Sequence, residues 1–477
     1  MNNIKKYTSS SSNNIAQVMK IIDHNGEGIC FILENEKLIG VVTDGDLRRS
    51  LIKGSEMSTN IKKVMNTDFI SLPIHTNDNK IRSTFSKKLR IIPLCDNDNK
   101  LIDLADSFRS HRIPILEPSL KGNEIKYVSD CLETNWISSQ GNYVNKFENI
   151  FNNLHQGYHS LAVSNGTVAL HLALIALGVG KEDEVIVPNI TFAASINSII
   201  HSGATPVLCE IDEKSWCINV DEAEKLITKK TKAIMPVHLF GQVCDVEKIQ
   251  ALAKKYNLLI IEDCAEAIGS SFMQNPVGTF GDASTFSFFG NKTISTGEGG
   301  MVLFKDIKFA EKARQLRDHG MSKEKKYWHN VVGFNYRLTN IQAAIGVAQM
   351  ERFNQIIKKK LEVAKFYSEN LKHVKKIKMF PLVQKKIVHS NWVFTIVFDE
   401  NVDRDKIIKS MITRGIDTRP VFYPLSSMPP YKKYRCSENL SSSIQISKFG
   451  LSLPSSVSIK LDEMNFVVNS LEKILSD

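Results

Sequence analysis

The sequence predicts an α/β protein, with a mostly parallel sheet wrapped by helices and a C-terminal α+β part, preceded by a small α/β domain. Three observations lead to this fold class. The chain has 477 residues, more than one hydrophobic core usually supports. Strand-like and helix-like segments alternate through its middle, and residues 29–51 resemble residues 91–111. We expect domains at 1–111, 112–358 and 359–477.

The N-terminal part contains a weak internal repeat. One copy, "ICFILENEKLIGVVTDGDLRRSL", begins at Ile29, and the other, "IIPLCDNDNKLIDLADSFRSH", begins at Ile91. Each copy reads as strand, polar turn, strand and helix, and a helix-like segment precedes each. The pair resembles a tandem of CBS modules. In that family a Thr and an Asp at the positions of Thr43 and Asp46 hold the ribose of an adenosine nucleotide. The second copy departs from this pattern, because Asp106 stands where Thr43 would repeat. A nucleotide sensor and a folded domain that mediates assembly therefore both stay open.

A linker is expected after this repeat. The stretch "RSHRIPILEPSLKGNEIKYVSD" begins at residue 109 and carries Pro114, Pro118 and Gly122 between two differently patterned regions. Proline and glycine at this density are typical of a loop, so the second domain begins here.

Strands and helices are then expected to alternate. The predicted strands are 159–164, 183–188, 205–211, 232–240 and the start of 258–269, and the predicted helices are 165–180, 189–203, a longer one after 205–211, and 245–257. Strands joined by such helices indicate a parallel sheet, in which ligands bind at the carboxyl ends of the strands. Two further strand-like segments, 391–398 and 416–424, belong to the C-terminal part.

Four features follow the ends of predicted strands. "SNGT" at 164–167 opens a helix, where free backbone N–H groups suit a phosphate, although Asn-Gly is also an ordinary turn. Asp263 ends a hydrophobic strand, where a carboxylate is costly without a cationic partner. Ser287 precedes Lys292, which lies between an aromatic strand and a glycine-rich turn. Phe192 follows another strand.

One cofactor uses all four features. Pyridoxal phosphate needs a lysine for a covalent bond, a carboxylate for its ring nitrogen, a phosphate cradle and a ring to stack on. Supporting motifs extend over about residues 112–477, among them "SNGTVALHLAL", "DEVIVPNITFAAS", "IEDCAEAIGS", "GDASTFSFFGNKTISTGEGGM" and "VGFNYRLTNIQAAIG". In these motifs the chain resembles the DegT/DnrJ/EryC1/StrS sugar aminotransferases, which have the fold-type-I aminotransferase architecture.

The resemblance implies roles for the residues around the cofactor ring. Lys292 binds the cofactor covalently and, once released, moves a proton between Cα of the amino donor and C4′ of the cofactor. Asp263 pairs with the ring nitrogen and Phe192 stacks on the ring. Glu266 faces the 3-hydroxyl, where many relatives carry Gln, and a carboxylate there shifts the local proton balance.

The resemblance also implies a phosphate site. The backbone of Gly166 and Thr167, the Ser287 hydroxyl and the Asn335 side chain are expected to hold the phosphate. Asn335 is expected to come from a second subunit, which makes a homodimer with shared active sites obligatory.

Five further residues are weaker candidates. His319, Tyr327 and Arg337 are candidates for contacts with the sugar or the amino donor, or are structural residues near the cleft. His171 lies in an apolar helical run, which favours a packed core residue. His238 stands at a strand end, where a structural role is favoured over one beside the cofactor.

The resemblance implies transfer of the amino group of glutamate to C4 of a nucleotide-linked 4-keto-6-deoxy sugar, for a surface polysaccharide such as an O-antigen. A sister branch that removes a sugar hydroxyl has histidine at the position of Lys292, so lysine favours amino transfer. Ser426 and Ser427 stand where a histidine is expected near the sugar. The sugar and its nucleotide, GDP, UDP or dTDP, therefore stay open. A nucleotide-sensing regulator with a cofactor-binding body is the alternative of a different class.

Composition limits the remaining classes. No apolar run approaches 18 residues and the N-terminus is polar, so no membrane span or secretory signal is expected. The 8 cysteines form no CxxC pair, which argues for reduced thiols in the cytoplasm and against a metal site. The net charge of +10 is spread along the chain, so no nucleic-acid partner is expected.

Overall fold

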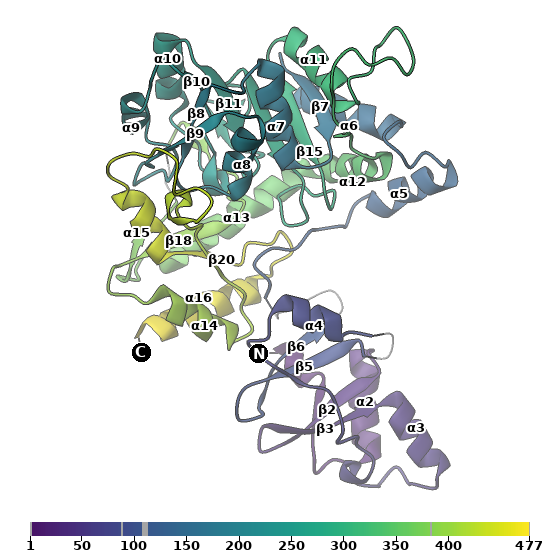
Figure 1. The fold of residues 1–477 in the computed structure, drawn as a ribbon. Coiled ribbons are helices and arrows are strands. Elements are labelled where there is room, and N and C mark those ends of the chain that lie inside the picture. The colour runs from purple at the N-terminus through teal and green to yellow at the C-terminus, as the bar shows by residue number, and fades with distance from the viewer. Residues whose placement is uncertain (1, 87–88, 107–112, 382–383, 477) are drawn as a thin grey trace. The chain divides into compact units, whose positions relative to one another are not determined.

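The structure, a computed structural model, describes residues 2–86, 89–106, 113–381 and 384–476 (Figure 1). The chain forms two compact units: Met1–Pro114 with Asp405–Thr418 and Lys473–Asp477, and Ile115–Arg404 with Arg419–Glu472. The predicted boundary after residue 111, the start of the predicted linker and the helix expected at the end of the second repeat copy lie outside the described residues. None of the described helices is long and apolar enough to cross a membrane.

The first unit contains two three-stranded sheets with the same topology, which confirms the internal repeat. In each sheet the middle strand is parallel to the first strand and antiparallel to the third. The strands are β1 (Thr8–Ser10), β2 (Ile29–Glu34) and β3 (Lys37–Thr43) in one sheet, and β4 (Leu72–Pro73), β5 (Ile91–Cys95) and β6 (Leu101–Asp106) in the other. The helices are α1 (Asn2–Lys5), α2 (Ile15–Asn25), α3 (Asp44–Ile52), η1 (Ile61–Lys63), α4 (Asp78–Thr84) and most of α14 (Arg404–Ile412).

The sequence of α2 explains its place in this unit. Ile15, Val18 and Ile22 recur at helical spacing and are buried in one core with β2 and β3. The Asn14 side chain caps the first turn, and Gly26 ends the helix in a left-handed conformation. Capping and one apolar face therefore fix the position of α2 on its sheet.

A seven-stranded sheet forms the centre of the second unit, in the order β7-β15-β14-β11-β10-β8-β9. The pairs β14–β15 and β15–β7 are antiparallel and the others are parallel. The strands are β7 (His159–Val163), β8 (Glu184–Pro188), β9 (Thr205–Cys209), β10 (Thr231–Ile234), β11 (Leu259–Asp263), β14 (Ala283–Ser287) and β15 (Gly300–Phe304). This sheet confirms the predicted fold class.

Both faces of this sheet are buried. Neighbouring residues of one strand, such as Leu303 and Phe304, enter different cores because side chains alternate along a strand. Apolar α7 packs on β14 and β15, while α12 packs on α5 and α6 (Figure 1). The helices of this unit up to α12 are α5 (Glu124–Glu133), α6 (Asn142–Leu154), α7 (Gly166–Leu177), α8 (Ala193–His201), α9 (Val220–Lys225), η2 (Leu239–Gly241), α10 (Val246–Tyr256), α11 (Ile307–Arg317) and α12 (Asn340–Glu351).

The prediction of a longer helix after β9 is wrong, because α9 has only 6 residues. The chain first turns around Trp216, which is buried and has a φ of 59°. Ile211 and Ile218 bridge the two sides of this turn. The residues before α9 therefore form this turn and are not part of a longer helix.

The C-terminal part carries a small antiparallel sheet in the order β16-β18-β20-β19. The predicted strand 416–424 shrinks to two residues, because Pro420 has no N–H to donate. The predicted domain boundary at 358–359 falls within helix α13 (Phe353–Leu371), which runs unbroken through it. This boundary stays a prediction. The other elements are β12 (Ser271–Phe272), β13 (Asn275–Pro276), β16 (Ile377–Met379), β17 (Ile387–Val388), β18 (Phe394–Phe398), β19 (Arg419–Pro420), η3 (Leu425–Ser427), α15 (Ser441–Phe449), β20 (Gly450–Leu453) and α16 (Leu461–Ser476).

Candidate active site

Lys292 lies in the turn between β14 and β15, near the carboxyl end of β14. Its Nζ lies 3.4 Å from Oε1 of Glu266 and 3.9 Å from the centroid of the Trp392 ring. The side chain is 13% exposed, so the amine is nearly enclosed yet still reachable. A lysine in this setting is not an ordinary solvated surface residue.

Asp263 is the last residue of β11 and is buried. Its Oδ2 accepts a hydrogen bond from the Ser195 hydroxyl at 2.8 Å, and its Oδ1 accepts one from the Ala265 N–H at 3.1 Å. Burial raises the pKa of Asp263, and the Ser195 hydrogen bond opposes that shift. Ser195 belongs to α8, so this helix positions the carboxylate.

Glu266 is the second buried carboxylate of the site. Its Oε2 accepts a hydrogen bond from the Phe240 N–H at 3.0 Å. Phe240 has a φ of 56°, a left-handed conformation that is costly for an aromatic residue. Burial raises the pKa of Glu266, and Lys292 opposes that shift. Two buried carboxylates thus lie near one amine.

The start of α7 forms a cradle next to Ser287. The Asn165 side chain caps the helix by accepting from the Val168 N–H, which leaves the first helical N–H groups, those of Gly166 and Thr167, without an intrahelical acceptor. A Cβ on Gly166 would lie 2.8 Å from Cβ of Ser287, so only glycine lets the two segments approach this closely.

Phe192 precedes α8 and is 60% exposed. Its ring begins a row of aromatic rings: Phe192 to Phe422 at 6.0 Å, Phe422 to Phe240 at 5.6 Å, and Phe240 to Trp392 at 6.3 Å between centroids. The row leads to Lys292, which is the group that Trp392 contacts.

These residues fit pyridoxal phosphate. With both carboxylates ionised, Asp263 and Glu266 carry one negative charge more than Lys292 balances, and a protonated ring nitrogen would supply the missing cation. The cradle at Gly166 offers N–H groups at the positive end of a 12-residue helix, which suits the phosphate. Phe192 leaves a ring face open for stacking.

A second cluster contains three other predicted residues, Asn335, His319 and Arg337. The Arg337 guanidinium lies 2.9 Å from Asp318 and 3.2 Å from Nε2 of His319, and its Nε donates to Asn335 at 3.1 Å. Among the described residues, no hydrogen bond or ion pair joins Asn335, His319 or Arg337 to Lys292, Asp263 or Glu266. Within one chain, these residues and those around Lys292 therefore form two separate clusters.

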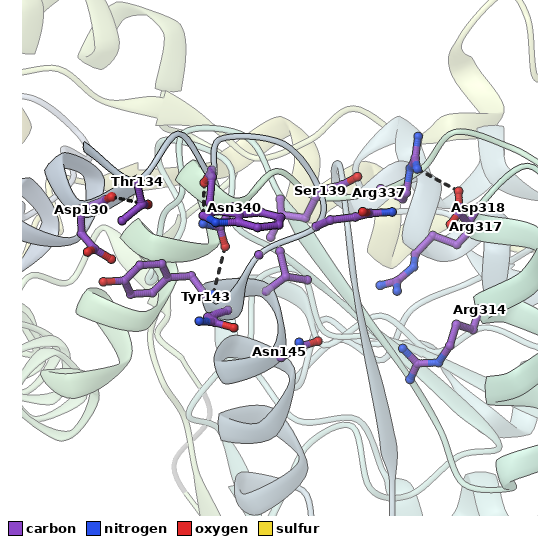
Figure 2. A pocket seen from close by; sticks show the side chains of 16 residues that line it. Asp130, Thr134, Ser139, Tyr143, Asn145, Arg314, Arg317, Asp318, Arg337 and Asn340 are labelled. Carbon is purple, nitrogen blue, oxygen red and sulfur yellow. Dashed lines mark hydrogen bonds and ion pairs between the residues drawn. The ribbon is translucent and has the colours of Figure 1, made fainter. Parts of the chain in front are cut away.

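The second cluster borders a cavity of about 800 Å³ (Figure 2). Figure 2 shows the Arg337–Asp318 ion pair on one side of the cavity and Asn340 on the other. Arg314 and Arg317 also line it, but both reach the buried carboxylate of Glu148. The cavity is thus rich in arginine, and each of these three guanidinium groups has an acidic partner.

Three single residues remain from the sequence prediction. Tyr327 is 76% exposed with a φ of 61°, and no contact among the described residues brings it to Lys292. His171 is buried and its Nδ1 lies 3.1 Å from the Tyr336 hydroxyl, in keeping with a core residue. His238 is buried, accepts from the Cys244 N–H and lies 3.0 Å from Glu262, which favours the structural role.

In the first unit, Thr43 and Asp46 bond to each other. The Thr43 N–H and hydroxyl both donate to Oδ2 of Asp46, at 2.9 and 2.7 Å, and the pair forms a capping box at the start of α3. Oδ1 of Asp46 binds Arg49 at 2.6 Å. Both groups named for the ribose are therefore engaged within the protein.

Sequence reasoning missed Ser195, Phe240 and Trp392. Ser195 is a polar residue in the apolar segment "TFAASINSII", a signal that could have marked it. Phe240 is the last residue of the predicted strand 232–240, where it reads as a core residue, and only its positive φ sets it apart. Trp392 begins a strand-like run, so its pattern indicates packing alone.

The fold and the site together define a pyridoxal-phosphate-dependent aminotransferase, with a mostly parallel sheet and a buried aspartate and a lysine at strand ends. The DegT/DnrJ/EryC1/StrS aminotransferase family matches residues 118–472, and the chain belongs to this family. A CBS domain matches residues 7–53, which include the first repeat copy.

Curated relatives share much of the second unit. GDP-perosamine synthase of Escherichia coli O157:H7 is 44% identical over 369 residues, which cover 76% of this chain and 99% of that protein. GDP-perosamine synthase of Vibrio cholerae is 43% identical over 366 residues, which cover 76% and 98%. About a quarter of this chain lies outside these matches.

Solved structures have the same fold. Helicobacter pylori PseC, an aminotransferase involved in the biosynthesis of pseudoaminic acid, is 29% identical with a TM-score of 0.72, covering 76% of this chain and 98% of that chain. The aminotransferase TlmJ of Streptoalloteichus hindustanus is 26% identical with a TM-score of 0.72, covering 76% and 99%.

Proposed function

We propose that this enzyme transfers the amino group of glutamate to C4 of a nucleotide-linked 4-keto-6-deoxy sugar, as a GDP-perosamine synthase does, for a surface polysaccharide such as the O-antigen of lipopolysaccharide. The observation that carries amino transfer is Lys292 beside two buried carboxylates. The sugar rests on the relatives named GDP-perosamine synthase at 43–44% identity. Ser426, whose N–H donates to the Asn189 side chain, and Ser427 are where a different sugar would be selected.

The proposed mechanism assigns one task to each side chain. Pyridoxal phosphate, when bound, supplies the electron sink for charge that develops at the donor Cα. Lys292 would move the Cα proton of glutamate to C4′ of the cofactor, and in the second half-reaction it would move a proton from C4′ to C4 of the sugar on one face. Asp263 keeps a proton on the ring nitrogen, and Ser195 holds Asp263 in place. Phe192 would stack on the ring, and Glu266 would face the ring's 3-hydroxyl.

The proposed phosphate site uses two subunits. Gly166, Thr167 and Ser287 provide it from one chain and Asn335 from the other, in a homodimer. Two observations support this: Asn335 is exposed and belongs to the second cluster, and the unit exposes large apolar side chains, including Trp136 at 58% and Val332 at 91%. His319, Arg337 and Tyr327 are proposed to contact the sugar or the donor there.

Complementation tests the shared site. Lys292→Ala and Asn335→Asp protein, each inactive alone, are mixed, unfolded and refolded together. If Asn335 acts on the partner's cofactor, half of the dimers are mixed and each has one intact site, so about a quarter of wild-type activity returns. A mixture that stays inactive while gel filtration shows mixed dimers overturns the shared site.

The N-terminal domain is proposed to bind an adenosine nucleotide through Thr43 and Asp46. The CBS match at residues 7–53 supports this ligand. Binding requires Asp46 to exchange its bonds with Thr43 for ribose hydroxyls. A cytoplasmic location is proposed as well, supported by 8 cysteines that are all free thiols.

Mass spectrometry tests the reaction. The protein is incubated with pyridoxal phosphate, glutamate and GDP-4-keto-6-deoxymannose, beside Lys292→Ala and Lys305→Ala, an exposed lysine after β15. A GDP-amino sugar from the wild type and Lys305→Ala, and none from Lys292→Ala, establishes it. No product while glutamate still converts the cofactor to its amine form discards this sugar and keeps the aminotransferase. A colourless protein that binds AMP overturns the enzyme in favour of a regulator.

A further inference from the structure

Trp392 contacts the reactive lysine from a distant part of the sequence. The indole lies in the segment before β18, is 6% exposed, and has its ring centroid 3.9 Å from Nζ of Lys292. An ammonium group at this distance from an indole face is attracted to it and held in one orientation. None of the steps proposed above uses this contact.

The same indole also holds the backbone beside Lys292. Its Nε1–H donates to the carbonyl of Asn291 at 2.7 Å, across 101 positions of sequence. Trp392 therefore contacts Lys292 at two points, the tip of the side chain through the ring face and the preceding peptide through the N–H. Two contacts fix a side chain more closely than one.

A buried lysine anchors Trp392. Lys360 of α13 is 2% exposed, and its Nζ donates to the carbonyl of Trp392 at 2.8 Å and to that of Ser455 at 2.7 Å. Burial lowers the pKa of Lys360 to about 7. A buried amine is costly unless its donors are bonded, so Lys360 ties the segment of Trp392 to the loop after β20.

Trp392 is also packed against the loop that holds Glu266. Its ring stacks on Phe240 at 6.3 Å with an interplanar angle of 23°. The Phe240 N–H donates to Glu266, whose other oxygen lies 3.4 Å from Nζ of Lys292. The amine is thus held between Trp392 and Glu266, and Phe240 links the two.

We propose that Trp392 is a positioning residue that keeps the amine of Lys292 within reach of the donor Cα after the amine is released, and that Lys360 positions Trp392. This inference rests on the proposed role of Lys292 in proton transfer. The ring face attracts the protonated amine but accepts no proton from it. Lys292 is therefore guided without losing its function as base and acid.

Three variants separate the contacts. Trp392→Phe keeps a ring face and loses the N–H, and Trp392→Leu loses both. Trp216→Phe is the matched control, because Trp216 is buried in the same unit and its Nε1 has no hydrogen-bond partner in the structure. The measured reaction is the conversion of the bound cofactor by glutamate, followed by absorbance, which needs no sugar.

The proposal expects a loss in rate rather than in binding. The first-order rate of conversion falls about 10-fold in Trp392→Phe and on the order of 10²-fold in Trp392→Leu, while the half-saturating glutamate concentration changes by less than about 2-fold. With α-deuterated glutamate the kinetic isotope effect rises in the same order, because proton transfer becomes rate-limiting. A purely structural role would not raise the isotope effect.

The anchor is tested on α13. Lys360→Met is expected to lower the rate in the same direction as Trp392→Phe, and Lys365→Met, an exposed lysine on the same helix, is expected to leave it unchanged. Wild-type rate and isotope effect in folded Trp392→Leu overturn the proposal, as does an equal loss in Trp216→Phe. If Trp392→Leu does not fold, Trp392→Phe decides by the same two measures.

A fluorescence readout separates this inference from the proposed function. Bound pyridoxal phosphate absorbs where indole emits, so loading the cofactor-free protein should quench Trp392. The wild type is expected to lose a component of emission that Trp392→Phe lacks. If the wild type shows this loss but glutamate converts nothing, the proposed function fails while the place of Trp392 stands. If the loss is equal in Trp392→Phe, the positioning role fails.

Discussion

The Lys292 site and the Thr43–Asp46 pair satisfy their polar groups in opposite ways. Thr43 and Asp46 bond to each other and Asp46 also binds Arg49, so their capping box is complete without a ligand. At the Lys292 site two buried carboxylates face one amine, and the helix start at Gly166 has free N–H groups. A site that is incomplete by itself indicates a ligand, whereas a pair that is complete must first open to bind one.

The largest expected effect comes from removing the amine. Lys292→Ala should lower the glutamate-dependent conversion of the cofactor by about 10²–10⁴-fold or more, because both proton transfers depend on this group. Stopped-flow absorbance measures the rate, with Lys305→Ala as the control. A Lys292→Ala protein that converts the cofactor at the wild-type rate would show that the proton transfers do not depend on Lys292.

Lys360 is a buried amine whose hydrogen bonds are made within the protein, because its two acceptors are backbone carbonyls. It can therefore be compared with Lys292, the amine of the incomplete site. Burial lowers the pKa of Lys360 to about 7, so between about pH 7 and 10 the unfolded chain holds a proton that the folded protein has lost. The free energy of unfolding therefore rises with pH in this window.

Lys360→Met should lack this rise. The free energy of unfolding of the wild type minus that of the variant is expected to grow by roughly 2 kcal/mol from about pH 7 to pH 9, measured by urea unfolding. Lys365→Met should show no such trend. A constant difference between wild type and Lys360→Met would mean that Lys360 keeps an ordinary affinity for its proton.

The incomplete charge balance should make the Asp263 carboxylate costly in the cofactor-free protein. Burial raises the pKa of Asp263 in the folded state, so stability is lost as pH rises through the interval between its unfolded and folded values. At neutral pH, Asp263→Asn should therefore raise the free energy of unfolding of the cofactor-free protein by about 1–2 kcal/mol, and should weaken cofactor binding.

Asp245→Asn is the matched control for this change. Asp245 caps α10 and is exposed, and asparagine is an equally good cap, so stability should stay constant. Guanidinium unfolding of both variants without cofactor gives the comparison. A stability loss in Asp263→Asn would show that the hydrogen bonds to Ser195 and Ala265 outweigh the burial cost.

The sequence predicted the parts of the fold and site that follow from local pattern. Asp263 ends β11 and Lys292 lies in the turn that follows β14, as expected, because alternating strands and helices fix which ends carry ligands. Trp392 could not be predicted, because its role depends on a contact across 101 positions with Asn291. Helix α9 is shorter than predicted because tertiary burial of Trp216 overrides local helical propensity in the residues before it.

The smallest effect is expected at the Thr43–Asp46 pair. Asp46→Ala should lower the free energy of unfolding by about 1 kcal/mol through loss of the cap, while Asp44→Ala, an exposed residue of the same turn, should change it less. Calorimetry with AMP should show weak binding to the full chain and none to Asp46→Ala, because the carboxylate must leave Thr43 to reach a ribose. The amino-transfer rate without nucleotide should be the same in both proteins. AMP binding that survives in Asp46→Ala would place the nucleotide on other residues, and the capping box would then be a purely structural feature of the first unit.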